Sequence, residues 1–385
     1  MPRSRTLPAA LPPPTASPPR AVPLSLAVPL SLAALLSLAV LLSLAVLGPT
    51  PTGTPPDVTA RTDAVLPLLV TSGAAPAAAL LALEGTRTRF AHAESRGTRH
   101  GARAIGRNDH FRAGSVTKTF IATVVLQLAT ERRLSLSDTV EEHLPGLLRG
   151  AAGDGRTLTL RSLLTHTSGL PDYTLDTSGT RPVTPRQAVR LALTHPPAAP
   201  GRFAYSNTNY VVLGMVVQQV TGHSYASEAE RRILSPLRLT GTSFPGARTS
   251  LPVPHGRAYS ADGSDVTETD PRAAGAAGEL VTTLTDLDRF YAALLRGELL
   301  PPGRLREMLD TRTAQGEYGM GVQPEKLPCG ITVWGHSGRI SGSYVRTAAT
   351  VDGRRVLTFR VNTDAWTDSG LDLAVLTAGF CPRTA

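Results

Sequence analysis

A serine and a lysine three residues apart are the side chains most suited to nucleophilic chemistry. They lie in Ser115-Val116-Thr117-Lys118, and of the 39 lysines and arginines in the sequence only Lys118 and Lys326 are lysines. Lysine, unlike arginine, can lose its proton when it is buried or crowded by charge. On a helix, residues three apart share one face, so the amine can reach the hydroxyl and act as the base that a serine nucleophile needs. We therefore hypothesise that Lys118 activates Ser115.

The residues around this motif favour the hypothesis. The stretch 114–131 is apolar on nearly all sides in its middle, which predicts a buried helix. Gly114 and Ser115 stand at its start, where free backbone N–H groups and the positive end of the helix dipole stabilise negative charge. The amide of Ser115 is therefore a candidate donor to a developing oxyanion.

Composition narrows the class of protein. The chain has 385 residues, of which 41% are hydrophobic, so it can form one large domain or two intimately packed ones. Its net charge is +9, but the arginines are scattered and only 5% of residues are aromatic. This pattern indicates a solvated basic surface and argues against nucleic-acid binding. Attraction to an anionic polymer of the cell envelope stays open.

The N-terminal part predicts export. Residues 1–20 are basic and proline-rich, and residues 21–47 are apolar and long enough to span a bilayer. We therefore expect residues 1–47 to be a signal peptide or a signal anchor. Pro23 and Pro29 weaken a helix there, which favours a cleaved signal over a permanent anchor.

A Pro/Thr/Gly linker at 48–56 precedes the expected functional domain, 57–385. No second long apolar span follows in the sequence. We therefore expect a secreted or extracytoplasmic domain, attached to a membrane only through residues 21–47 if these are not cleaved.

Two cysteines, Cys329 and Cys381, lie in the last part of the chain. In an exported protein this favours a disulfide, and two buried free thiols are the alternative. Two cysteines without a histidine cluster do not form a structural zinc site, and we expect no metal and no cofactor.

The pattern of apolar and turn residues predicts an α+β fold. Strands are expected at both ends of the domain and helices in between, with a helical insertion at about 134–280. The strands would then form one antiparallel sheet flanked by helices. The predicted strands are 76–84, 87–94, 331–335, 342–350 and 354–362, and the predicted helices include 207–222 and 370–380.

Two further triplets complete a known pattern. They are Tyr205-Ser206-Asn207, before a predicted helix, and His336-Ser337-Gly338, at the end of a predicted strand. Each alone is compatible with a turn tyrosine, a helix cap or a structural histidine.

With Ser-x-x-Lys, these triplets occur in the order found in the serine β-lactamase and penicillin-binding protein family, which residues 57–385 resemble. The resemblance is strongest to class C β-lactamases and secreted serine D-alanyl-D-alanine carboxypeptidases. It implies a β-lactamase/transpeptidase-like α/β sandwich with a mainly helical subdomain.

The resemblance implies four catalytic residues. Ser115 would attack a carbonyl carbon and become acylated, and Lys118 would help to remove its proton. Tyr205 would relay a proton to the leaving group. His336 would hold the Tyr205 phenol and supply positive character.

The resemblance also implies four substrate-binding residues, Asn207, Ser337, Gly338 and Arg339. Asn207 would bind both the substrate and the catalytic lysine. The backbone N–H of Arg339 would join that of the nucleophile at the oxyanion. Some carboxypeptidases of the family carry an arginine near position 323 that binds the substrate's carboxylate, whereas this chain has Gln323. We hypothesise that the Arg339 side chain replaces it.

Three other residues are candidates for supporting roles. His166 is a rival base, but its setting within the 163–170 stretch looks structural in the family. Asp172 and Tyr173 are expected to shape the rim of the pocket. The Gly-x-Ser-x-Gly motif of α/β-hydrolases is absent from the sequence.

The leading functional hypothesis is an exported D-alanyl-D-alanine carboxypeptidase that acts on peptidoglycan stem peptides. The second is an esterase, amidase or weak β-lactamase on the same fold, and the third is a non-catalytic sensor that stays acylated by penicillin. The expected partners are therefore a stem peptide or a small β-lactam or ester, and we expect a monomer.

Overall fold

The computed structural model describes residues 58–382 apart from 73–74, 95–103 and 367. The described residues belong to a single unit by their contacts. The expected export signal and linker at 1–56 lie outside the described residues. Within the described part of the chain, no helix combines the length and apolar character that a membrane crossing requires.

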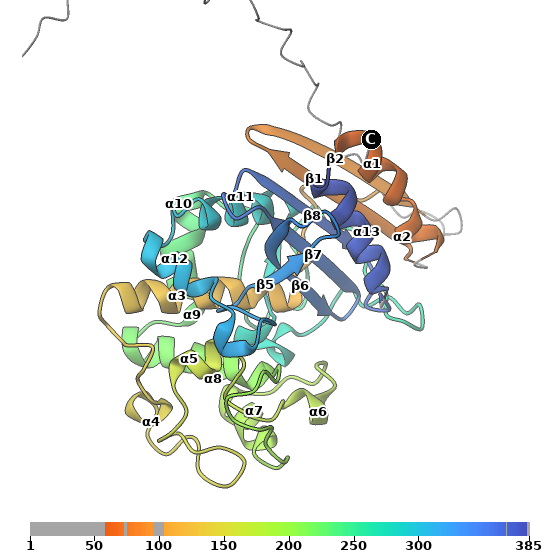
Figure 1. The fold of residues 1–385 in the computed structure, drawn as a ribbon. Helices are drawn as coiled ribbons and strands as arrows, with labels where there is room; N and C mark the ends of the chain where they lie inside the picture. The colour runs from red at the N-terminus through yellow and green to blue at the C-terminus, as the bar shows by residue number, and fades with distance from the viewer. Residues whose placement is uncertain (1–57, 73–74, 95–103, 367, 383–385) are drawn as a thin grey trace, which may run out of the picture. The chain divides into compact units, whose positions relative to one another are not determined.

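One antiparallel sheet is built from both ends of the domain, as predicted (Figure 1). Its strand order is β2-β1-β8-β7-β6-β5, so the first and last thirds of the domain meet where β1 pairs with β8. A second, two-stranded sheet joins β3 to β4. The strands are β1 Ala77–Glu84, β2 Arg87–Glu94, β3 Phe111–Arg112, β4 Val281–Thr282, β5 Gln323–Lys326, β6 Thr332–Ile340, β7 Ser343–Ala349 and β8 Arg355–Val361.

Helices cover both faces of the large sheet and fill the region between β3 and β4 (Figure 1). They are α1 Val58–Val65, α2 Leu68–Thr71, α3 Thr117–Thr130, α4 Val140–His143, α5 Leu160–Leu164, α6 Thr174–Thr177, α7 Pro185–Ala192, α8 Asn207–Thr221, α9 Tyr225–Ala229, α10 Ser235–Leu237, α11 Leu284–Leu295, α12 Pro302–Met308 and α13 Ser369–Phe380. The short 3-10 or π segments are η1 Gly114–Val116, η2 Glu230–Leu234, η3 Pro271–Ala273, η4 Gly275–Ala277 and η5 Arg312–Ala314.

Alternation along β1 shows why the sheet is covered on both sides. Ala78 and Leu80 belong to the hydrophobic cluster of α1, α2 and α13, whereas Ala79 and Leu81 belong to the cluster of α3, α8 and α11. Successive side chains of a strand point to opposite faces, so both faces of β1 are apolar and buried. The result is an α/β sandwich of the predicted class.

Two predicted elements differ from the observed ones. The strand expected at 331–335 continues as β6 to Ile340, so the His336 triplet lies inside the strand rather than after it. Strand β5 was not predicted, because Pro324 and its polar neighbours give no apolar alternation. A half-exposed edge strand is the place where a sheet tolerates proline.

The middle of the domain is less helical than predicted. Helices α4 to α10 are there, but no helix occurs between Leu237 and Pro271. Prolines 245, 252 and 254 and several glycines interrupt that stretch. The helix predicted at 207–222 is confirmed as α8, and it ends at Gly222, which has the left-handed conformation (φ 78°) common at helix C-termini.

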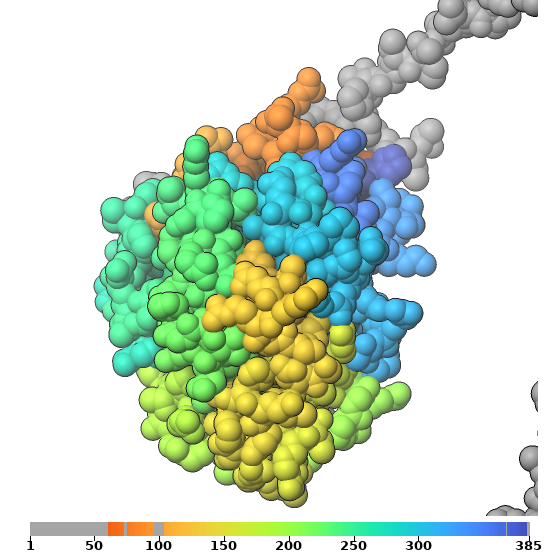
Figure 2. Space-filling view, turned by 90° about the vertical axis from the view of Figure 1, so that its left-hand side faces the viewer, coloured from red at the N-terminus to blue at the C-terminus, as the bar shows by residue number. Residues whose placement is uncertain are grey.

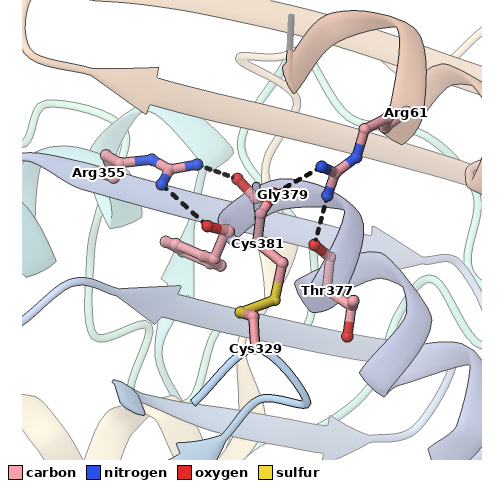
Figure 3. Close-up of a disulfide and its surroundings, with 7 residues drawn as sticks. Arg61, Cys329, Arg355, Thr377, Gly379 and Cys381 are labelled. Carbon is pink, nitrogen blue, oxygen red and sulfur yellow. Dashed lines mark hydrogen bonds between the residues drawn. A yellow bond between two sulfur atoms is a disulfide. The ribbon is translucent and has the colours of Figure 1, made fainter. Parts of the chain in front are cut away.

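A disulfide closes the C-terminal part of the domain, as predicted (Figure 3). It joins Cys329, in the turn between β5 and β6, to Cys381, at the end of α13. The bond fastens the last helix to the edge of the sheet.

Two arginines bind backbone carbonyl groups at the end of α13 (Figure 3). Arg61 donates to the carbonyl oxygens of Cys381 (2.6 Å) and Thr377 (2.8 Å), and Arg355 donates to that of Phe380 (3.0 Å). The last carbonyls of a helix lack partners within it, and cations are favourable at that end of the helix dipole. Both terminal segments of the domain therefore hold α13 in place.

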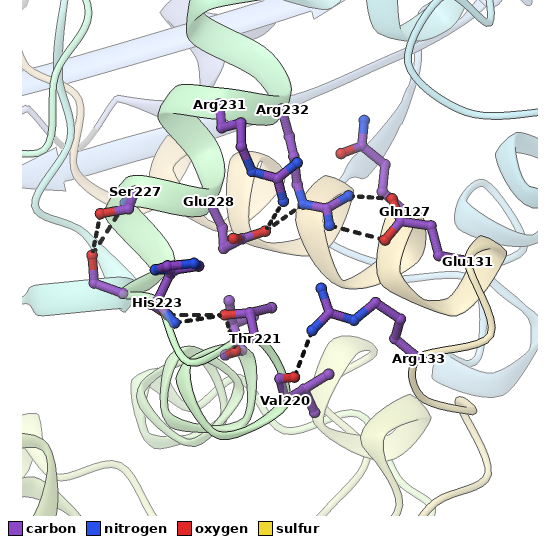
Figure 4. A network of polar contacts seen from close by, with 12 residues as sticks. Gln127, Glu131, Arg133, Val220, Thr221, His223, Ser227, Glu228, Arg231 and Arg232 are labelled. Atoms are coloured by element: carbon purple, nitrogen blue, oxygen red, sulfur yellow. Dashed lines mark hydrogen bonds and ion pairs between the residues drawn. The ribbon is translucent and has the colours of Figure 1, made fainter.

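A buried ion-pair network fixes the far end of α3, the helix that carries the Ser-x-x-Lys motif (Figure 4). Arg232 of η2 donates to Glu228 of α9 (2.5 Å) and to Glu131 at the end of α3 (2.9 Å). The side chains of Glu228 and Arg232 are 1% and 6% exposed. Buried charges are tolerated when they are paired in this way, and loss of one partner is strongly destabilising.

Replacing both Cys329 and Cys381 by alanine is expected to lower the free energy of unfolding by about 4 kcal/mol, from the loop of 52 residues that the bond closes. Urea denaturation of the oxidised wild type and of the double variant measures the difference. The reduced wild type is the matched control and is expected to behave as the double variant does. Equal unfolding midpoints for oxidised and reduced protein would contradict the expectation.

Candidate active site

The Ser-x-x-Lys motif lies where η1 continues into α3. Ser115 is in η1, and Lys118 is in the first turn of α3 with none of its surface exposed. The Lys118 Nζ atom is 3.0 Å from the Ser115 Oγ atom. The helix therefore brings the amine and the hydroxyl into hydrogen-bond contact, as the spacing predicts.

Three oxygen atoms surround the Lys118 amine. Besides Ser115 Oγ, they are Asn207 Oδ1 (2.8 Å) and the carbonyl oxygen of Ala277 (2.7 Å). The last two are carbonyl oxygens, which can only accept hydrogen bonds. The Asn207 amide turns its oxygen toward the lysine because Asn207 Nδ2 donates to Asp172 Oδ2 (2.8 Å). A neutral amine has two hydrogens for these acceptors, which leaves its lone pair for the Ser115 hydroxyl proton.

Burial lowers the pKa of Lys118 to about 7, and the nearby Asp172 carboxylate raises it in part. An ordinary lysine has a pKa near 10.4 and is almost entirely charged at neutral pH. A lysine with a pKa near 7 is neutral in a large share of molecules. The site therefore holds an amine that can accept a proton.

The Tyr205 ring lies beneath this amine. Its centroid is 4.9 Å from the Lys118 Nζ atom, and its phenol is near enough to the Ser115 hydroxyl for that group to influence the phenol's pKa. Although 36% of the Tyr205 surface is exposed, burial is the largest influence on the phenol and raises its pKa, which the neighbouring Ser115 hydroxyl lowers in part. The phenol therefore stays protonated and can donate a proton.

His336 does not contact Tyr205 as expected. Its Nε2 atom is 2.7 Å from the Tyr318 hydroxyl, and its Nδ1 atom is 2.5 Å from the carbonyl oxygen of Ser337. Burial, and next the charge of Lys118, lower the pKa of His336 to about 3. The structure therefore does not show the expected contact between His336 and the Tyr205 phenol, because the Tyr318 hydroxyl occupies the Nε2 atom. Burial also disfavours the charged form of the ring.

His166 is a buried support for Tyr205. Its Nδ1 atom accepts hydrogen bonds from the Ser206 backbone N–H (3.2 Å) and Asn209 Nδ2 (3.0 Å), and Ser168 fixes the Asn209 amide in that orientation. The lone pair of Nδ1 is thus occupied, and burial lowers the pKa of His166 well below its usual value. Its ring lies 4.2 Å from the Tyr205 ring, so it positions the phenol by packing.

Strand β6 passes very close to the nucleophile, and two glycines permit this. A Cβ atom at Gly338 would overlap the carbonyl oxygen of Ala113, and one at Gly114 (φ 51°) would lie 2.7 Å from the Arg339 carbonyl oxygen. Only glycine fits at such close approaches. The backbone of Gly338 and Arg339 therefore runs beside the Ser115 amide, at the N-terminal end of the helix.

A cavity of about 480 Å³ opens at Ser115. Among the expected substrate-binding residues, Asn207 and Arg339 line it, whereas Ser337 and Gly338 do not. Its lining also includes Tyr173, as expected for the rim. The full lining is Ser115, Tyr173, Thr174, Ser178, Gly179, Thr180, Asn207, Ala273, Ala274, Ala277, Gly278, Arg339, Ile340, Ser341 and Asp364.

The side chain of Arg339 is already engaged. Its guanidinium group donates to the carbonyl oxygen of Trp366 and lies 5.8 Å from the centroid of the Tyr344 ring. A second arginine near the site, Arg346 of β7, is buried and donates to Gln323 Oε1 (2.8 Å). Both guanidinium groups are thus partly occupied by the protein's own acceptors.

Sequence reasoning missed the roles of Asp172 and Arg346. Asp172 was expected at the rim, but its carboxylate orients Asn207 by accepting from both the backbone N–H (3.1 Å) and Nδ2 (2.8 Å). The sequence does contain a sign of the Arg346 contact, because an arginine within an otherwise apolar strand needs a buried hydrogen-bond acceptor. The lysine's third acceptor, the carbonyl of Ala277, carries no side-chain signal.

No group of three or more His, Cys, Asp or Glu side chains in the described part of the chain is placed to hold a metal ion.

Comparisons with known proteins identify the family and the fold. The family model described as Beta-lactamase matches residues 62–379. A D-stereospecific amidohydrolase from Streptomyces sp. has a similar structure, with 40% identity, a TM-score of 0.75 and coverage of 84% of this chain and 98% of that one. The D-amino acid amidase of Ochrobactrum anthropi SV3 is 26% identical, with a TM-score of 0.74 and coverage of 84% and 98%.

Among curated proteins, the chain is similar to PbpX of Bacillus subtilis (strain 168), whose name describes a penicillin-binding protein. The two are 31% identical over 215 residues, which are 55% of this chain and 52% of PbpX. The chain therefore spans about half the length of that relative. The family match covers most of the described domain, and the resemblance seen in the motifs is confirmed. The chain belongs to the β-lactamase family and has the fold of that family's serine hydrolases.

Proposed function

We propose that the protein hydrolyses amides or esters of D-configured amino acids or short peptides through an acyl-enzyme on Ser115. The observation that carries this proposal is the buried Lys118 amine, 3.0 Å from Ser115 Oγ and held by two pure acceptors. The D-configuration is suggested by the D-stereospecific amidohydrolase to which the chain is 40% identical. The Cys329–Cys381 disulfide supports action outside the cytoplasm, where such bonds persist.

Acylation begins with a proton transfer. The lone pair of neutral Lys118 takes the Ser115 hydroxyl proton while Oγ attacks the substrate's carbonyl carbon. The carbonyl oxygen becomes an oxyanion and receives hydrogen bonds from the backbone N–H groups of Ser115 and Arg339. Each such donor is worth about 3 kcal/mol in the transition state.

Collapse of this intermediate releases the leaving group. The bond from the carbonyl carbon to the leaving nitrogen or oxygen breaks, and the Tyr205 phenol gives that atom a proton. The raised pKa of the phenol suits it to this role, because it is protonated at the start of the step. The Lys118 ammonium, whose Nζ is close to the Tyr205 ring, returns a proton to the phenol. Water then attacks the ester by the same route and frees Ser115.

The two arginines near the site already donate hydrogen bonds within the protein, which favours a substrate with an uncharged leaving group. A carboxypeptidase must bind the free carboxylate of its leaving amino acid, for which a bidentate arginine is the usual partner. Arg346 donates to Gln323, and Arg339 donates to Trp366. An amide or ester requires no such partner.

D-alanyl-D-alanine carboxypeptidase activity on peptidoglycan peptides is the second candidate. One observation favours it: Arg339 lines the cavity beside Ser115. If its guanidinium exchanges the Trp366 carbonyl for a substrate carboxylate, then the peptide's terminus would be bound there.

The first prediction concerns the pH dependence of acylation. Because the base must be neutral, kcat/KM is expected to rise with pH through an apparent pKa near 7 and then level off. Lys118→Arg, which cannot lose its proton, is expected to lower kcat/KM by about a thousandfold or more. The matched control is Lys326→Arg, at the chain's other lysine, which is exposed on β5. Retained activity in Lys118→Arg would exclude this lysine as the base.

The second prediction concerns Asp172. Its carboxylate raises the pKa of Lys118, so Asp172→Asn is expected to lower that pKa and to shift the acidic limb of the pH profile to lower pH. The measurement is kcat/KM against pH for an amide substrate. Asp262→Asn, in an exposed loop, is the control and is expected to leave the limb in place. A shift to higher pH would contradict the assignment.

The third prediction separates the candidate functions. Purified protein is tested with D- and L-amino acid amides, a D-amino acid methyl ester, a D-alanyl-D-alanine peptide and a labelled penicillin. The first candidate predicts turnover of the D-amides and the D-ester but not of the L-amides, and loss of turnover in Ser115→Ala. Turnover of the D-alanyl-D-alanine peptide would instead support the carboxypeptidase. In that case Arg339→Ala is expected to raise the KM for the peptide and to leave the KM for the ester unchanged. A long-lived penicillin adduct without turnover would indicate a sensor.

A further inference from the structure

A second cavity adjoins the one at Ser115. It has a volume of about 470 Å³, within the range of small-molecule sites, and lies between α7, α8, α9 and the segment 271–279. The two cavities share Tyr173 and Ala274 as walls, but Ser115 and Asn207 line only the first. The second cavity is therefore a neighbour of the candidate active site and not a part of it.

Most of this cavity is apolar, and its floor is buried. The rim residues Pro182, Thr184 and Gln218 are exposed, so the cavity is open to solvent. The floor consists of the buried residues Val211, Gly214, Ala188, Ala276 and Glu279. A small apolar molecule could thus enter from the surface and lose most of its contact with water.

Close packing builds the floor. A Cβ atom at Gly214 of α8 would lie 2.6 Å from the Ala276 Cβ atom and 3.1 Å from the Tyr225 ring. The 275–279 turn and the Tyr225 ring therefore rest directly on the backbone of α8. This packing fixes the position of the turn that carries Glu279.

The floor carries one carboxyl group. Glu279 is 3% exposed, and its Oε1 atom accepts a hydrogen bond from the Tyr225 hydroxyl (2.7 Å). Among the described residues, no Lys, Arg or His forms an ion pair with it, and its Oε2 atom has no donor. Arg272 lines the rim, but Asp270 binds its guanidinium group at two oxygens (3.0 and 2.5 Å).

A buried carboxylate is costly unless a cation or several donors compensate it. The Tyr225 hydrogen bond compensates only in part, because burial still raises the pKa of Glu279 to about 7. Tyr225, Tyr173 and Arg272 are the other ionisable side chains that line the cavity. None of them is a free cation, so the carboxylate form of Glu279 has no counter-charge in the lining of the cavity.

From the cavity, its buried carboxyl group and the free Oε2 atom, we propose that this site binds a small organic amine. The ammonium group hydrogen-bonds to Glu279, and the apolar body of the amine fills the space along α7 and α8. A carboxylate ligand would be repelled by Glu279, and a neutral ligand would leave its charge uncompensated. The proposal does not depend on the reaction at Ser115.

The test is direct binding of 2-phenylethylamine, with 2-phenylethanol as a neutral ligand of the same shape. Isothermal titration calorimetry of the wild type is expected to show tighter binding of the amine. Glu279→Gln keeps the shape and a hydrogen-bonding group but removes the charge, and is expected to weaken amine binding by at least about tenfold, with no change for the alcohol. The matched control is Glu298→Gln, an exposed glutamate outside the cavity, which is expected to bind as the wild type does.

The pH dependence gives a second readout. Amine affinity for the wild type is expected to rise with pH between about 6 and 8, as Glu279 loses its proton, while the amine stays charged. In Glu279→Gln this rise is expected to disappear.

Two further variants locate the amine. Met215→Trp places a larger side chain in the cavity lining and leaves Glu279 unchanged, so it is expected to abolish binding of both ligands. This variant keeps the test informative if Glu279→Gln does not fold. Ser115→Ala is expected to bind the amine as the wild type does. The proposal is overturned if the wild type binds no amine, if Glu279→Gln binds it unchanged, if Met215→Trp still binds it, or if Ser115→Ala loses it.

Discussion

The candidate site depends on one amine kept out of water among three oxygen atoms. Lys118 has no exposed surface, and its Nζ atom contacts Ser115 Oγ, Asn207 Oδ1 and the Ala277 carbonyl oxygen. Burial lowers the pKa of the amine, and two pure acceptors consume its hydrogens. The lone pair is then left for the serine. A fixed hydrogen-bond pattern thus converts a common surface cation into a base directed at one hydroxyl group.

The aromatic and histidine rings around the amine complete this environment without adding charge. His336 is neutral and bound to Tyr318, and His166 is neutral and packs against the Tyr205 ring. A positive histidine at either place would repel the lysine's ammonium form and the proton that it must receive. The rings therefore act as packing that positions the phenol, and the one nearby carboxylate, Asp172, keeps the amine's pKa from falling further.

The two buried titratable groups of this region, Lys118 and Glu279, differ in how many hydrogen-bond partners the protein gives them. Lys118 has three protein oxygens around its amine, whereas Glu279, which lines a mostly apolar cavity, has a single donor. The segment 271–279 links them, because it supplies both the Ala277 carbonyl and the Glu279 carboxyl group. A ligand in the second cavity would thus sit against the same short turn that holds the lysine.

The sequence by itself determined the parts that depend on local spacing. Ser115 and Lys118 meet because three residues make nearly one turn of helix, and α8 ends where Gly222 permits the left-handed conformation. Apolar stretches joined by turn residues predicted β1, β7 and β8. The tertiary structure decided which distant groups meet. His336 binds Tyr318 rather than Tyr205, and Asp172 orients Asn207. Backbone carbonyls, burial and the contacts between remote segments leave no mark in local spacing, because they arise only when β6, α8 and the 271–279 turn pack around the nucleophile's helix.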